Sequence, residues 1–234
     1  MNRENNRKNF ELRNISIETN INKHAEGSAL VSFGDTKVIC TATIENQVPR
    51  WMRNSDAGWV TAEYGMMPRS TNERMNREAS RGKQSGRTLE IQRLIGRSLR
   101  QAVNPRYLKD KTITVDCDVI QADGGTRTAS ITGGCVALFL AIQHHIKDHR
   151  AIKDYVAAVS LGIIGDEILV DLDYNEDSNA DTDMNIVMTG SDSLIEIQGT
   201  AEEKPFSQDQ LNEMLQIASK SIKSLIEIQK ACLS

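Results

Sequence analysis

The chain of 234 residues is long enough for one large domain or two small ones, and its 39% hydrophobic and 26% charged residues are the balance of a soluble globular protein. No apolar run approaches the ~20 residues of a membrane span, and the polar first residues lack the apolar core of a signal peptide, so neither a membrane anchor nor export is expected. The net charge of −4 conceals a basic stretch, because residues 50–100 hold ten Arg and one Lys against five acidic residues, which indicates either a local anionic partner or a solvated surface segment.

The first part of the chain predicts an antiparallel meander of three strands. Polar and apolar residues alternate over residues 14–21, 28–33 and 37–44, which is the pattern of half-buried strands. Residues 47–84 have no sustained period and are rich in Asn, Ser, Gly and Arg. We interpret them as a long functional loop, with a disordered segment as the alternative.

The rest of the chain alternates helices and strands. Helices are expected at residues 88–103, 128–147 and 207–231, and strands at residues 112–121, 156–164, 167–173, 184–189 and 193–198. Ser207 and Gln210 predict a capping box at the start of the last helix. The order indicates an α+β fold with helices packed on a mostly antiparallel or mixed sheet. We find no repeat and no linker, so a single domain over residues 1–234 is expected.

A glycine-containing junction lies between the strand at 112–121 and the apolar helix that follows it. Gly124 and Gly125 let the backbone approach a ligand closely, and the free N–H groups of a helix N-terminus suit an anion. Further donors for phosphate oxygens come from Thr126, Arg127 and Ser130. The junction therefore predicts a phosphate site. The alternative is a glycine turn in which Thr128 or Ser130 caps the helix.

An acidic run extends from Asp171 to Asp183. Carboxylates at this density repel one another unless they are solvated or a cation lies between them, and Mg²⁺ needs only one or two carboxylates besides water and substrate phosphate. A calcium-binding EF-hand that starts at Asp173 is excluded, because Ser178 stands where Gly is required and Met184 where Glu is required. A solvated acidic loop remains the alternative to a metal site.

A series of basic residues in the long loop suits RNA phosphates: Arg69, Arg74, Arg77, Arg81, Lys83 and Arg87. Aromatic residues make up only 4% of the chain, so contacts to the RNA backbone are expected rather than base stacking. His144, His145 and His149 are explained by favourable charge at a helix C-terminus rather than by a metal. The four scattered cysteines indicate reduced thiols in the cytoplasm.

Motifs along most of the chain resemble the ribonuclease PH family, which includes polynucleotide phosphorylase and the exosome ring subunits. The resemblance covers residues 15–206 and rests on residues 23–28, 33–36, 58–66, 82–87, 121–130, 181–190 and 198–202. It implies a ribosomal-protein-S5-domain-2-like α+β fold, also called the RNase PH fold, and a homohexameric ring built as a trimer of dimers. It also implies a cytoplasmic enzyme that trims tRNA precursors and other structured RNAs from the 3′ end, with inorganic phosphate as co-substrate.

The resemblance also implies roles for individual residues. Phosphate is expected at Arg87, Gly125, Thr126 and Arg127. Mg²⁺, or alternatively Mn²⁺, is expected at Asp177 and Asp183, which together with Arg127 are the expected catalytic residues. RNA is expected at Arg69, Arg74, Arg77 and Arg81.

Two other functions are consistent with the same fold. A catalytically silent RNA-binding ring subunit would be expected to lack the acidic pair or the phosphate arginines, which this chain retains. A small-molecule kinase on a related fold would need a Gly/Ser-rich nucleotide loop, for which Gly124 and Gly125 are too short.

Overall fold

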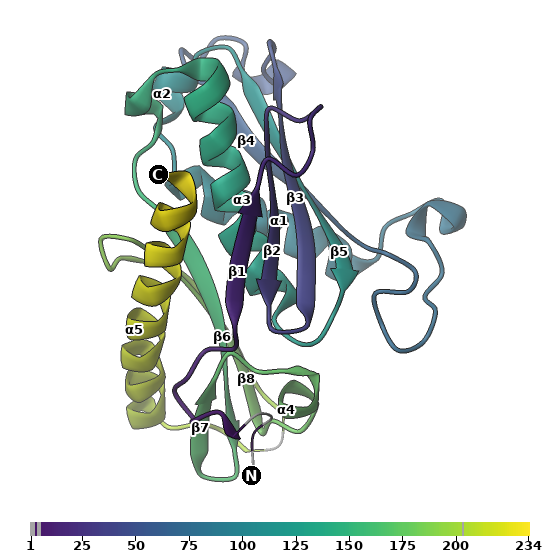
Figure 1. Cartoon of the computed structure of the whole chain (residues 1–234), viewed down its shortest axis with the longest axis vertical. Helices are drawn as coiled ribbons and strands as arrows, with labels where there is room; N and C mark the ends of the chain where they lie inside the picture. Colours follow the sequence, from purple (N-terminus) through teal and green to yellow (C-terminus); the bar gives the residue numbers. More distant parts are fainter. Residues whose placement is uncertain (1–2, 4–5, 203) are drawn as a thin grey trace.

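Two β-sheets form the framework of the computed structural model, which describes residues 3, 6–202 and 204–234 (Figure 1). The first sheet is mixed and five-stranded, and its strands in spatial order are β1 (Ile15–Thr19), β2 (Gly27–Phe33), β3 (Thr36–Glu45), β5 (Thr112–Gln121) and β4 (Trp59–Met66). The second is antiparallel and four-stranded, in the order β7 (Glu167–Val170), β6 (Val156–Ile164), β8 (Thr182–Thr189) and β9 (Leu194–Ala201). The α+β class is therefore confirmed, with two sheets in place of the one expected.

Three long helices accompany the sheets: α1 (Gly86–Gln101), α3 (Thr126–Ala141) and α5 (Gln208–Leu233). Ser207 caps α5 with the predicted capping box, accepting a hydrogen bond from the Gln210 amide. A π-helical turn, Ile142–Ile146, prolongs α3. Two short helices were not predicted, α2 (Pro105–Leu108) and α4 (Tyr174–Ser178).

The N-terminal meander matches the prediction. Strands β1, β2 and β3 pair antiparallel, with Val31 opposite both Ile17 and Val38, so the apolar residues share the face that packs on the helices. Strand β4 corrects the interpretation of residues 47–84 as irregular throughout. Its residues Val60, Ala62 and Tyr64 are buried, and the strand pairs parallel to β5 at the edge of the sheet.

Helix α3 is the centre of the molecule. It packs against β2, β3 and β5 of the first sheet and β6 of the second, so one hydrophobic core serves both sheets. Every residue of α3 except Arg127 is buried. With its π-helical turn this helix is long and apolar enough to cross a membrane, but 78% of its apolar window is buried inside the protein, as in a core helix. Its first turn is therefore held in place by packing on both sides.

Candidate active site

The loop between β5 and α3 has a backbone that only glycine adopts readily. Gly124 and Gly125 have φ angles of +71° and +65°. A Cβ at Gly124 would lie 2.3 Å from the Leu172 carbonyl oxygen. Thr36 fixes the loop from β3, because its hydroxyl donates to the Gly124 carbonyl at 2.6 Å and accepts from the Asp123 amide at 2.9 Å. The loop is thus pressed against the acidic segment and is rigidly placed.

Among the described residues, no side chain caps the N-terminus of α3. Gly125 occupies the N-cap position. The hydroxyl groups of Thr128 and Ser130 donate backwards, to the carbonyl oxygens of Gly125 at 2.9 Å and Thr126 at 2.7 Å, so the alternative in which either one caps the helix is wrong. Ser130 is fully buried and cannot serve a ligand, which corrects its expected role. The uncapped amides and the helix dipole favour an anion at this position.

Thr126 and Arg127 present their side chains from the first turn. The Thr126 hydroxyl lies 3.0 Å from the hydroxyl of Tyr64, a buried residue of β4. Arg127 donates from Nη1 to Gln198 Oε1 at 2.8 Å and from Nη2 to Glu90 Oε2 at 3.1 Å. Strand β9 and helix α1 therefore each contribute one side chain that accepts a hydrogen bond from Arg127.

Arg87 lies in the first turn of α1, and its side chain is exposed. The helix start is well defined, because Ser85 accepts from the Thr88 amide at 3.1 Å and Glu78 accepts from the Thr88 hydroxyl at 2.7 Å. The charges of Arg87 and Arg127 both act to lower the pKa values of Asp177 and Asp183, which burial raises, so the two arginines and the two carboxylates lie in one electrostatic neighbourhood.

The acidic run divides into structural and free carboxylates. Four of its six members hold other parts of the chain: Asp171 binds Arg13, Asp173 caps α4, Glu176 binds Arg3 and Arg7, and Asp181 accepts from the Gly165 amide. Within the part of the chain that the structure describes, no donor hydrogen-bonds the carboxylates of Asp177 and Asp183. The solvated loop is therefore excluded for most of the run, and a free pair is left.

The electrostatic environment of Asp177 and Asp183 favours a cation between them. Burial, followed by the charge of Asp177, raises the pKa of Asp183 to about 6. Burial also raises the pKa of Asp177, although the two arginines partly offset it. No group of three or more His, Cys, Asp or Glu side chains that could hold a metal ion occurs among the described residues, so a metal here would rely on two carboxylates.

Arg13 connects the glycine loop to the acidic segment. Its Nη1 donates to the Asp123 carbonyl oxygen, and its Nη2 donates to Asp171 Oδ1 at 2.7 Å. Asp171 is fully buried at a φ of +54° and also accepts from the Arg13 amide at 2.8 Å. The sequence offered no signal for this contact, because Arg13 precedes the first strand and belongs to none of the motifs. Arg13 therefore links the glycine loop to the acidic segment that leads to Asp177.

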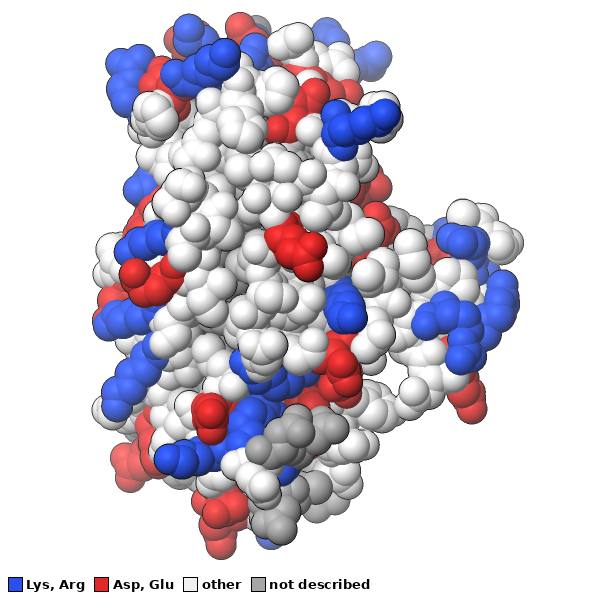
Figure 2. All heavy atoms as spheres, in the orientation of Figure 1, with Lys and Arg blue, Asp and Glu red and all other residues white. Residues whose placement is uncertain are grey.

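The basic loop begins beside this site, where the Ala122 amide donates to the Ser70 carbonyl oxygen at 2.8 Å, and then extends away from it. Residues 67–85 project from the side of the molecule (Figure 1), and Figure 2 shows Lys and Arg side chains gathered on this projection. Its arginines are all exposed: Arg69, Arg74, Arg77 and Arg81. Only a local contact, from Arg74 Nη1 to Asn76 Oδ1 at 3.3 Å, is formed by these side chains within the described residues. Their guanidinium groups are free to bind an anionic chain.

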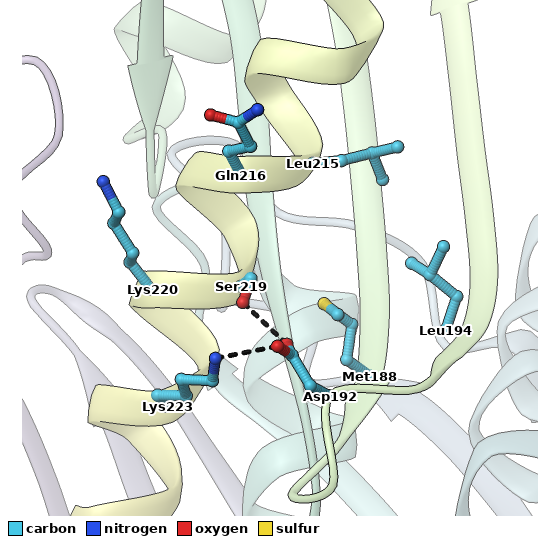
Figure 3. A pocket seen from close by; sticks show the side chains of 8 residues that line it. All are labelled: Met188, Asp192, Leu194, Leu215, Gln216, Ser219, Lys220 and Lys223. Carbon is cyan, nitrogen blue, oxygen red and sulfur yellow. Dashed lines mark hydrogen bonds and ion pairs between the residues drawn. The ribbon is translucent and has the colours of Figure 1, made fainter.

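A hollow elsewhere on the surface does not belong to the site. It lies between the β8–β9 hairpin and α5, where Asp192 binds Ser219 and Lys223 (Figure 3). Met188, Leu194 and Leu215 supply its apolar wall. None of the expected site residues lines it, so the chemistry is expected at the glycine loop.

Comparison with known proteins gives a consistent family assignment. Residues 11–142 match the model for domain 1 of the 3′ exoribonuclease family, and residues 154–221 match the model for its domain 2. A curated relative, ribonuclease PH of Mesorhizobium japonicum, is 60% identical over 225 residues, which are 94% of each chain.

Solved structures share the fold at low sequence identity. Rice Rrp46 covers 99% of this chain and 100% of its own, with a TM-score of 0.81 and 18% identity. An Archaeoglobus fulgidus exosome with RNA bound to the active site has a TM-score of 0.81 at 22% identity and covers 96% of this chain and 91% of its own. An archaeal exosome core has a TM-score of 0.77 at 23% identity, covering 96% and 89%.

Proposed function

This chain belongs to the ribonuclease PH family of 3′ exoribonucleases, and from that membership we propose that it trims the 3′ ends of tRNA precursors and other structured RNAs. It is a phosphorolytic 3′→5′ exoribonuclease: inorganic phosphate replaces water, and each cycle releases a nucleoside diphosphate. The observation that carries this function is the 60% identity to a ribonuclease PH over nearly the whole chain. The silent ring subunit is not favoured, because the phosphate arginines and the acidic pair are retained.

The geometry suits an in-line attack by phosphate. An oxygen of the attacking hydrogen phosphate forms a bond to the last phosphorus of the RNA, and the bond from that phosphorus to the penultimate 3′ oxygen breaks. The proton of the attacking phosphate ends on this 3′ oxygen, which becomes a hydroxyl group, and the released nucleotide is a nucleoside diphosphate. We propose that the amides at Gly125 and Thr126, with Arg87 and Arg127, hold the attacking dianion and neutralise the charge that gathers on its oxygens. The two amides are fixed before substrate arrives, because the loop is held by Thr36 and Arg13.

We further propose that Asp177 and Asp183 hold Mg²⁺, with Mn²⁺ as the alternative ion. The fit rests on two carboxylates that lack hydrogen-bond donors among the described residues and whose pKa values are raised, so that a cation would relieve their repulsion. When bound, the ion would supply positive charge to the leaving 3′ oxygen and its phosphate.

RNA is proposed to reach the site across the projecting loop. Arg69, Arg74, Arg77 and Arg81 are exposed on the projecting loop, so they would contact the RNA backbone upstream of the reacting end. A homohexameric ring and a cytoplasmic location also remain proposals. Exposed apolar side chains, among them Trp51, Leu194 and Ile197, supply surface for subunit contacts.

One catalytic domain over residues 1–234 is supported by the core that both sheets share.

The test is the product formed from an RNA with a 3′ extension. With Mg²⁺ and phosphate, the protein should release nucleoside diphosphates. With excess nucleoside diphosphate and no phosphate, it should extend the 3′ end. Nucleoside monophosphates released without phosphate would make the protein a hydrolase and overturn the proposal. Loss of activity in excess EDTA, restored by Mg²⁺, would support the metal pair.

A further inference from the structure

A closed ring of hydrogen bonds surrounds the end of Arg127. Arg127 donates to Gln198 Oε1 at 2.8 Å and to Glu90 Oε2 at 3.1 Å, and Gln198 Nε2 donates to Glu90 Oε1 at 2.8 Å. The three residues come from α3, α1 and β9, which meet only in the folded protein. Each side chain in the ring thus fixes the other two.

The position of Glu90 needs an explanation. Its carboxylate lies against an arginine of the proposed phosphate site, where a negative charge opposes a dianion. The side chain of Glu90 is 40% exposed and that of Arg127 is 15% exposed, and an ion pair that solvent still reaches contributes only modestly to stability. Stabilisation of the fold therefore does not explain the ring well. We look for its role in the orientation of Arg127.

The third nitrogen of Arg127 shows what the ring leaves available. Arg127 Nε is buried, and no hydrogen-bond acceptor for it occurs among the described residues. A buried donor without a partner is unfavourable and is rare in native proteins. In a guanidinium group the Nε hydrogen and one Nη2 hydrogen point the same way, forming a fork that matches two oxygens of a phosphate. Gln198 and Glu90 accept from Nη1 and Nη2, so the Nε donor is left without an acceptor among the described residues while the ring fixes its direction.

We propose that Glu90 and Gln198 are positioning residues, which hold the outer edge of Arg127 so that its Nε edge binds the attacking phosphate. The inference rests on the proposed phosphorolytic function and adds the residues that prepare its phosphate site. Glu90 acts as a hydrogen-bond acceptor, and its charge is tolerated because that charge is already engaged by Arg127. Neither residue touches the phosphate.

The chain offers a matched control. Arg97 of α1 binds Glu196 of β9 through two hydrogen bonds, at 2.9 and 2.6 Å. This pair joins the same two elements as Glu90 and Gln198 but does not contact Arg127. Glu196→Ala therefore removes an ion pair between α1 and β9 and leaves the ring intact. Both Glu90 and Glu196 are partly exposed, so their variants should fold.

The experiment measures phosphate binding directly, without turnover. Inorganic phosphate is titrated calorimetrically into the wild-type protein and into Glu90→Ala, Glu90→Gln and Glu196→Ala. We expect the phosphate Kd to rise roughly tenfold in Glu90→Ala, the scale of losing a hydrogen bond to a charged group. Glu90→Gln should recover part of that loss, because its amide oxygen can still accept from Arg127, whereas its NH2 group cannot accept from Gln198 Nε2. Glu196→Ala should bind as the wild type does.

Three results would overturn the inference. Unchanged or tighter phosphate binding by Glu90→Ala would show that Glu90 is indifferent or competes with the anion. An equal loss in Glu196→Ala would show that only the packing of α1 on β9 matters. A Glu90→Gln variant as weak as Glu90→Ala would show that charge, not orientation, is the cause. Steady-state kinetics should add a rise in phosphate KM with RNA KM nearly unchanged. A failure of the proposed function would be seen separately, as binding of phosphate without release of nucleoside diphosphates by the wild type.

Discussion

Ionised Asp183 should lower the free energy of unfolding of the metal-free protein at neutral pH. The Asp183→Asn variant should therefore be more stable than the wild type while it loses activity. Burial and the neighbouring Asp177 raise the pKa of Asp183 to about 6. An Asp in an unfolded chain has a pKa of about 3.9. The folded protein therefore holds this proton more tightly than the unfolded chain does, and ionisation of Asp183 opposes folding.

The direction and size of the effect follow from this difference. Below about pH 4 both forms are protonated, and the group has no effect on stability. Between about pH 4 and pH 6 the free energy of unfolding falls as pH rises, and above pH 6 the loss is complete. A shift of about two pKa units at about 1.4 kcal/mol each corresponds to at most about 3 kcal/mol. Asn has nearly the same shape and does not ionise, so Asp183→Asn should recover this amount.

Urea denaturation from pH 4 to pH 8, in EDTA, measures the effect. The variant should exceed the wild type by up to about 3 kcal/mol at pH 8, and the two curves should converge toward pH 4. Mg²⁺ should then stabilise the wild type more than the variant. Asp148→Asn is the control, because Arg150 lowers the pKa of Asp148 to about 2, and removing that charge should not stabilise the protein. A variant that is less stable at pH 8, or a difference independent of pH, would refute the reasoning.

Three further predictions concern the phosphate loop and the arginines. Arg127→Ala should lower phosphate-dependent turnover or raise phosphate KM, together by roughly 10²-fold, with RNA affinity nearly unchanged in a separate titration. Replacing Arg69, Arg74 and Arg77 together with Ala should weaken binding of a tRNA precursor and reduce the slope of log K against log salt by about one unit per lost phosphate contact. If both sets of variants shift both titrations equally, the two groups of arginines form one undivided site. Gly124→Ala should lower the free energy of unfolding by roughly 1–3 kcal/mol, because its Cβ would lie 2.3 Å from a carbonyl oxygen at a φ of +71°; an unchanged Tm would contradict this.

The spacing of apolar residues along the chain predicted those strands and helices whose buried residues recur at regular intervals. Strands β5 and β6 begin and end where the alternating or continuous apolar residues do, at Thr112–Gln121 and Val156–Ile164. Strand β4 was missed because only three of its residues point inward, glycines stand near both of its ends, and its partner β5 lies far along the chain. Helix α4 spans five residues, too few for a helical period, although its capping box of Asp173 and Glu176 was readable in the sequence.

The sequence proposes the residues of the candidate site but does not reveal the side chains that hold them in place. The motif residues Arg87, Arg127, Asp177 and Asp183 do lie within one electrostatic neighbourhood. Glu90, Gln198 and Arg13 lie in separate elements, and nothing in a single sequence states that these elements meet at the glycine loop. The RNA contacts of Arg69, Arg74, Arg77 and Arg81, and the metal contacts of the acidic pair, stay predictions.

The conformational entropy of ordering a binding site is lost either when the chain folds or when the substrate binds. The burial of α3 decides which of the two applies to the phosphate site. Inorganic phosphate is too small to provide the binding free energy that would order a mobile loop. Because both sheets and Arg13 already immobilise the first turn of α3, that entropy is lost once, when the chain folds. RNA is large enough to make many contacts, so its proposed site can lie on the exposed side chains of residues 67–85. The proposed phosphate site is thus on a buried, immobilised segment and the proposed RNA site on an exposed one.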